Sequence, residues 1–112
     1  MGKALQIRVI ATTWNTDLLE ELWPRLTELA QSIHVKHECG GVLEMVRSLS
    51  DGLQFLPWSE ARRSALGPGI REAMRLKAAL EAALADWKPG EANRYSDALE
   101  ATLDALEQAY VD

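Results

Sequence analysis

The stretch IREAMRLKAALEAALADWKPGEANRYSDALEATLDALEQAY, residues 70–110, decides the fold class of this chain. Apolar residues recur every three or four positions on both sides of its central Lys-Pro-Gly, as in an amphipathic helix. They are Ile70, Ala73, Met74, Leu80, Leu84 and Trp87 before the turn, and Tyr95, Leu99, Leu103, Leu106 and Tyr110 after it. Because the connection is so short, we predict an antiparallel hairpin of two helices, residues 70–87 and 91–110.

Two more helical patterns precede this hairpin. The first has one apolar stripe, made of Leu18, Leu19, Leu22, Trp23, Leu26, Leu29, Ala30 and Ile33. Pro24 removes a backbone hydrogen bond from the middle of this stripe, so we predict a bend or a division near Trp23. The second pattern is made of Val42, Met45, Val46, Leu49, Leu53 and Leu56. It predicts a helix that is weakest at Gly52 and ends before Pro57.

The connection between residues 57 and 70 contains two further signals. Ser59 is a capping residue at the start of a short basic helix, residues 60–66. The sequence LGPG, residues 66–69, combines two glycines with a proline, which predicts a loop before the hairpin. Trp23 and Trp87 both fall on apolar helical faces, so we expect both in the core.

Residues 4–11 fit two periods, because Leu5, Ile7, Val9 and Ala11 alternate as in a strand while other pairs suit a helix. A strand needs a partner, and the other alternating run is residues 33–38. We therefore predict an all-α fold, a compact bundle of about five helices that ends in the helical hairpin. The alternative is an α+β fold with a small N-terminal sheet from residues 4–11 and 33–38. Either way, residues 1–112 are expected to form a single globular domain.

The charge and composition exclude some partners. The chain has 112 residues and a net charge of −5, so its mean field repels phosphate backbones, and we predict no nucleic-acid partner. No stretch reaches the roughly 20 apolar residues of a membrane span, and the first residues lack the continuous apolar core of a secretory signal. The single cysteine fits a reducing compartment. We predict a cytoplasmic protein without a membrane partner.

His34, His37 and Cys39 form the one cluster of transition-metal ligands, with the spacing HxxHxC. Imidazole and thiolate are the ligands that zinc prefers, so a metal-binding or metal-sensing site is one interpretation. It needs a fourth ligand from Glu38, another carboxylate or a second subunit. The favoured interpretation is a helix end, because basic side chains followed by Gly40 are typical of a C-terminal cap.

No group of residues predicts an enzyme. Asp97, Glu100, Asp104 and Glu107 recur every three or four positions, which indicates a solvated helix face rather than a catalytic acid pair. The chain has no glycine-rich phosphate loop and no nucleophile elbow. In composition it resembles histidine phosphotransfer domains, but neither histidine is followed by the lysine and small residue of their HxxKG motif. We expect a protein without catalytic residues and without a cofactor other than the possible zinc.

The candidate partner-binding residues are Trp58, Arg62 and Arg63, which follow one another closely just after Pro57. Trp and Arg are enriched at the energetically important positions of protein interfaces. The alternative is that Trp58 closes one end of the bundle. We therefore predict an adaptor, regulatory or chaperone-like protein that acts by contact. It would form a homodimer, or would dock a helix of another protein in a groove between its own helices.

Overall fold

Five α-helices make up the part of the chain that the structure, a computed structural model, describes, which is residues 17–33 and 41–111. They are α1 (Asp17–Leu22), α2 (Pro24–Ile33), α3 (Val42–Phe55), α4 (Glu60–Ala85) and α5 (Pro89–Ala109). These two ranges contain no strand, which confirms the all-α prediction. Of the residues in the alternative sheet only Ile33 is described, and it is the last residue of α2.

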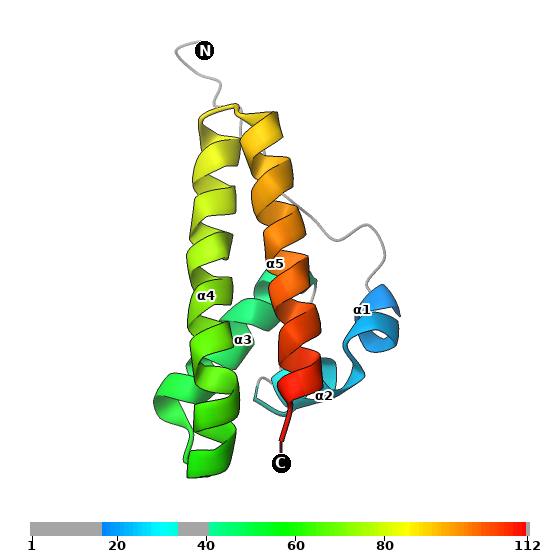
Figure 1. The fold of residues 1–112 in the computed structure, drawn as a ribbon, viewed down its shortest axis with the longest axis vertical. Coiled ribbons are helices and arrows are strands. Elements are labelled where there is room, and N and C mark those ends of the chain that lie inside the picture. The colour runs from blue at the N-terminus through cyan, green and yellow to red at the C-terminus, as the bar shows by residue number, and fades with distance from the viewer. Residues whose placement is uncertain (1–16, 34–40, 112) are drawn as a thin grey trace, which may run out of the picture.

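The predicted helical hairpin is confirmed as α4 and α5, which run antiparallel along the length of the molecule, as Figure 1 shows. The helices α2 and α3 lie against the half of the hairpin that is far from its tip, and α1 packs on α2. Gly69 brings α4 and α5 close together, because a Cβ at this position would lie 2.5 Å from Cδ2 of Leu106. Among the described helices, none is long and apolar enough to cross a membrane.

The main core joins side chains from all five helices. Its buried members are Leu19, Trp23, Leu26, Leu29, Ala30, Met45, Val46, Leu49, Leu53, Leu66, Ile70, Ala73, Leu76, Leu99, Leu103 and Leu106. Trp23 lies between α1 and α2, so the division expected at Pro24 is confirmed. It is buried as predicted, and its Nε1 donates a hydrogen bond to Oδ1 of Asp104 at 2.8 Å.

A carboxylate of α5 caps the N-terminus of α2. Pro24 has no N–H, and the next two backbone N–H groups, of Arg25 and Leu26, donate to Oε1 of Glu107 at 3.1 and 3.0 Å. Arg25 Nε also pairs with Oε2 at 3.2 Å. Because helix N-termini attract negative charge, these bonds fix α2 to α5. The prediction of a solvated face is therefore wrong for Glu107, whose side chain is only 13% exposed.

The helix α4 is continuous through residues 66–69, where the sequence predicts a loop. That prediction is wrong because Leu66 and Ile70, one helical turn apart, are both fully buried in the core. Pro68 lies on the exposed side of the helix, so its cost is limited mainly to one missing backbone donor. Ser59 starts the helix as predicted, since its Oγ accepts a hydrogen bond from the N–H of Arg62 at 3.2 Å.

Trp87 is 64% exposed, so its expected place in the core is wrong. It lies at the tip of the hairpin, just after the end of α4, with φ of 58°. Its N–H donates to the carbonyl of Leu84 and that of Lys88 to the carbonyl of Ala83, at 3.1 and 2.8 Å. This is the Schellman pattern, in which glycine usually takes the left-handed position. Here Trp87 takes that position. Because α4 ends at Ala85, Trp87 no longer belongs to the apolar face of the helix.

Candidate functional site

The predicted partner-binding residues Trp58, Arg62 and Arg63 lie at the corner where α3 turns into α4. The helix α3 ends at Phe55, because Pro57 cannot supply the next backbone donor. The N–H of Leu56 still bonds to the carbonyl of Gly52 at 3.0 Å, and that of Trp58 bonds to the carbonyl of Leu56 at 2.9 Å. The connection is therefore a tight and hydrogen-bonded turn.

Trp58 faces inward from this turn. Its ring packs on the backbone of α3 at Gly52, where a Cβ would lie 2.5 Å from Cζ2 of Trp58 and 2.6 Å from Cδ1 of Ile33. The side chain is half-buried against the main core. This position agrees with the alternative interpretation, in which the tryptophan closes one end of the bundle.

Arg62 contacts two aromatic rings of its own chain. Its guanidinium carbon lies 5.6 Å from the ring centre of Trp58 and 5.5 Å from that of Tyr110. Its Nε donates to the carbonyl of Val111 at 3.1 Å. Arg25 lies 5.7 Å from the ring centre of Tyr110 as well. These contacts tie the start of α4 to the end of α5, so the charge of Arg62 is engaged inside the molecule.

Arg63 lies on a more exposed part of the corner. Its Nη1 donates to the carbonyl of Leu56 at 3.2 Å, which keeps the side chain beside the turn. Phe55 is 76% exposed and Leu56 is 38% exposed. We call Phe55, Leu56 and Arg63 the corner patch. It combines an apolar surface with a cation, as interface residues commonly do.

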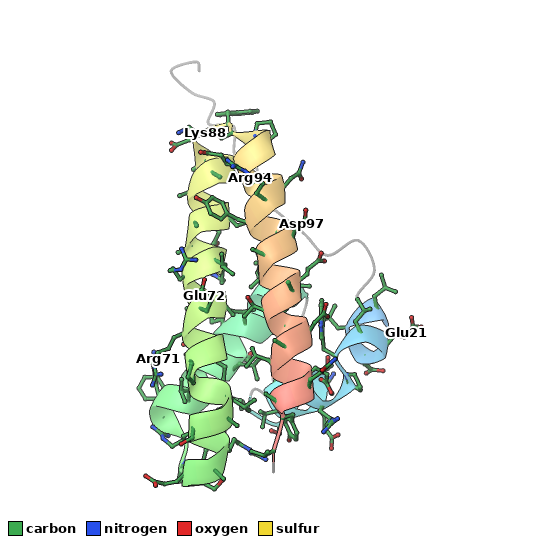
Figure 2. The ribbon with its side chains drawn as sticks, in the orientation of Figure 1. Glu21, Arg71, Glu72, Lys88, Arg94 and Asp97 are labelled. Carbon is green, nitrogen blue, oxygen red and sulfur yellow. The ribbon has the colours of Figure 1, made fainter. Side chains whose placement is uncertain are left out.

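A groove of about 400 Å³ runs between α3 and α4 and includes Arg63 of the corner patch. Its lining residues are Ser50, Leu53, Gln54, Arg63, Ile70, Arg71 and Met74. In Figure 2, Arg71 lies at the outer edge of α4, on the side away from α5. We call this cavity the α3–α4 groove. It has an apolar floor from Leu53, Ile70 and Met74, and two arginines of one helix beside it.

The two arginines give the α3–α4 groove its electrostatic character. Neither Arg63 nor Arg71 forms an ion pair with a carboxylate of residues 17–33 or 41–111. Both side chains are exposed, in a chain whose net charge is −5. This arrangement can hold an apolar side chain and attract a carboxylate. It places no acid–base pair or activated nucleophile in the groove.

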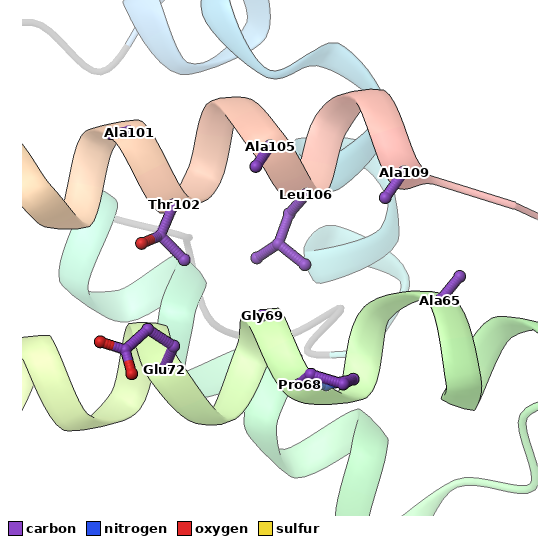
Figure 3. Close-up of a pocket in the computed structure, with 9 residues that line it drawn as sticks. All are labelled: Ala65, Pro68, Gly69, Glu72, Ala101, Thr102, Ala105, Leu106 and Ala109. Carbon is purple, nitrogen blue, oxygen red and sulfur yellow. The ribbon is translucent and has the colours of Figure 1, made fainter.

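A second groove, of about 500 Å³, lies between α4 and α5 and is drawn in Figure 3. Small side chains line most of it, including Ala65, Ala101 and Ala105. Its one carboxylate, on Glu72, accepts hydrogen bonds from Nε of Arg75 at 3.0 and 3.1 Å. Bonding to this guanidinium lowers the pKa of Glu72, and both groups are exposed. Because Arg75 already pairs with the carboxylate of Glu72, this groove offers a charged partner weaker contacts than the α3–α4 groove does.

The predicted metal ligands His34, His37 and Cys39 lie outside the described residues. Within residues 17–33 and 41–111, no three histidine, cysteine or carboxylate side chains are grouped as a metal site would require. Zinc binding by the HxxHxC sequence therefore stays a prediction.

Phe55 and Arg71 are among the site residues that the sequence did not predict. Phe55 does not lie on the apolar stripe of its helix. A large apolar residue outside that stripe is the sequence signal that could have identified it. Arg71 carries no sequence signal of its own, because its relation to Arg63 depends on the helix continuing through Pro68.

Comparison of the chain with protein families, with curated proteins and with solved structures finds no match.

Proposed function

We propose that this protein acts by contact, as a non-catalytic cytoplasmic module that docks another protein at the corner patch and the adjoining α3–α4 groove. The observation that carries the proposal is the exposure of Phe55, which is 76% exposed at the end of a helix whose following turn is held by two backbone hydrogen bonds. Burying a phenylalanine side chain contributes about 1.5–3 kcal/mol, which this fold leaves unused.

The surroundings of Phe55 also support a contact surface. Leu56 extends the apolar area, and Arg63 is fixed beside it by the carbonyl of Leu56. Beneath them the ring of Trp58 packs closely on the backbone of α3 at Gly52. A preorganised surface loses less conformational entropy on binding, so such a corner suits a docking role. Of the predicted residues, Arg63 is thus the one at the surface, while Trp58 and Arg62 support it.

Site-specific photo-crosslinking in cells tests this function. A benzophenone amino acid replaces Gln54, which lines the groove beside Phe55, and in a matched strain it replaces Gln108 on the exposed face of α5. We expect one discrete adduct from position 54 and no corresponding adduct from position 108. Mass spectrometry then distinguishes a different protein from a second copy of this chain.

The outcomes separate the alternatives. An adduct with another protein supports docking, and an adduct with the same chain supports the homodimer interpretation. Equal labelling from both positions, or no discrete adduct from position 54, contradicts a docking function at this surface.

A further inference from the structure

We propose that the α3–α4 groove recognises an acidic amphipathic helix of another protein, one with two carboxylates about two turns apart and an apolar pair between them. This inference rests on the proposed contact function and adds the chemistry of the partner. It follows from the spacing of the two arginines, the apolar floor between them and the charge of the remaining surface.

The spacing of the cations sets the spacing of the partner's carboxylates. Arg63 and Arg71 are eight residues apart on one continuous helix, which corresponds to about 12 Å along its axis. A helix lying beside α4 places residues seven or eight apart at about the same distance. Two carboxylates with that spacing therefore match the separation of the two arginine positions along α4. Arginine suits this role because its planar group can bind a carboxylate through two parallel hydrogen bonds.

The floor of the groove defines what lies between those carboxylates. Leu53, Ile70 and Met74 line the groove, and Phe55 is exposed at the corner where α3 ends. On a docked helix, the residues three and four positions after the first carboxylate face the same side as both carboxylates. An apolar pair at these two positions would cover the floor, as in other complexes where a helix lies in a groove.

The rest of the surface favours this location for an acidic partner. The chain as a whole carries −5, so an acidic helix is repelled by the molecule on average. It is attracted locally by Arg63 and Arg71, which form no ion pair with the carboxylates of residues 17–33 and 41–111. A second copy of the chain fits less well. Its α5 has Asp97 and Asp104 seven residues apart, but Asp104 already accepts the hydrogen bond of Trp23 Nε1. In addition, Glu100 and Ala101 stand where the apolar pair is needed. The occupant we infer is thus a different protein.

Fluorescence anisotropy with a synthetic peptide tests the inference. The probe is a labelled alanine-rich helical peptide with two Glu residues two turns apart and a Leu pair between them, and the charge-reversed probe carries Lys in place of Glu. The double variant Arg63→Glu, Arg71→Glu reverses the charge of the groove. The matched control is Lys88→Glu, Arg94→Glu, which changes the net charge equally near the hairpin tip, as Figure 2 shows.

We expect the wild type and the tip control to bind the Glu probe, and the groove variant to bind it at least about tenfold more weakly, which is about 1.4 kcal/mol. The groove variant should bind the Lys probe better than the wild type does. Binding of the Glu probe should weaken as salt is raised. The single variant Arg71→Gln gives the same test with a smaller change, should the double variant fail to fold.

Equal binding of the Glu probe by the wild type and the groove variant overturns the inference, and so does an absence of binding to the wild type. If the crosslink from position 54 to another protein persists while the Glu probe does not bind, the contact function stands. In that case only the acidic helical partner is wrong.

Discussion

At the scale of single residues, Gly52 determines how the corner is built. The ring of Trp58 and the side chain of Ile33 lie so close to its backbone that a Cβ would contact both at 2.5 and 2.6 Å. We expect Gly52→Ala to lower the free energy of unfolding by about 1–3 kcal/mol, because the ring must move. The control is Gly90→Ala, since a Cβ there meets nothing within 4 Å. Urea denaturation measures both, and equal stability of the two variants contradicts this account of the corner.

Trp87 leads to a prediction of the opposite sign. It occupies a left-handed position with φ of 58°, which costs an ordinary residue about 1–2 kcal/mol, and its ring is largely exposed. We therefore expect Trp87→Gly to raise the free energy of unfolding by about 1 kcal/mol. Trp87→Ala is the control, because it removes the ring and keeps the strain. A Trp87→Gly variant no more stable than Trp87→Ala would show that the backbone conformation carries no cost.

Predictions for single residues from the sequence depended on where the helices end. Trp23 was predicted correctly, because it lies inside a strong apolar stripe. Trp87 belonged to such a stripe too, but α4 ends at Ala85, and residues beyond that point no longer follow the helical period. Phe55 shows the converse, since it lies within α3 but away from its apolar face. Helix ends are the least certain part of any such pattern.

At the scale of elements, α2 depends on a residue more than eighty positions away. Glu107 accepts the backbone hydrogen bonds of Arg25 and Leu26, which have no partner within their own helix. We expect Glu107→Ala to lower the free energy of unfolding by about 1–2 kcal/mol, the usual effect of removing an N-terminal cap. Glu100→Ala, an exposed acidic residue on the same helix, should change it by less than about 0.5 kcal/mol.

Circular dichroism during urea denaturation checks this pair of variants. Similar losses in Glu107→Ala and Glu100→Ala would mean that the cap contributes nothing beyond surface charge.

The cap could not have been predicted from the sequence, because acidic residues at Asp97, Glu100, Asp104 and Glu107 have the same period. Only the packing of α2 across α5 distinguishes the last of them.

The existence of the helices was predictable, and the continuity of α4 through Pro68 was not. Apolar residues repeat at helical spacing in every described helix long enough to show it, and Pro24 and Pro57 interrupt that pattern where helices end. Pro68 is different because Leu66 and Ile70 on either side of it are both buried by other elements. Their burial outweighs the lost hydrogen bond of the proline, and this tertiary contribution is absent from a local pattern.

At the scale of the whole molecule, the hairpin is supported unequally along its length. The main core joins all five helices, whereas the part near the tip contains a small separate cluster of Leu80, Ala83 and Ala92. We expect the amide hydrogens of residues 80–84 to exchange about tenfold faster than those of residues 70–76. Hydrogen exchange measured by mass spectrometry or NMR checks this. Equal protection along α4 would mean that the hairpin opens only as one unit.

The candidate site also depends on contacts between helices, which a local sequence pattern does not contain. The sequence identified the corner through Trp58, Arg62 and Arg63, because aromatic and basic residues cluster beside a proline. It did not separate their roles, since the contact of Arg62 with the ring of Tyr110 joins residues that are 48 positions apart in the sequence. The α3–α4 groove likewise needs both helices in place before Arg63 and Arg71 line one cavity.

The central claim is that the exposed side chain of Phe55 binds a partner protein and does not stabilise the fold. The measurement that tests it most directly is the yield of the crosslink from position 54 in a Phe55→Ser variant, with the unfolding free energy of that variant as the control. We predict that the adduct is lost while stability changes by less than about 0.5 kcal/mol, as for other exposed side chains. An unchanged yield of the adduct in the stable variant would contradict the claim.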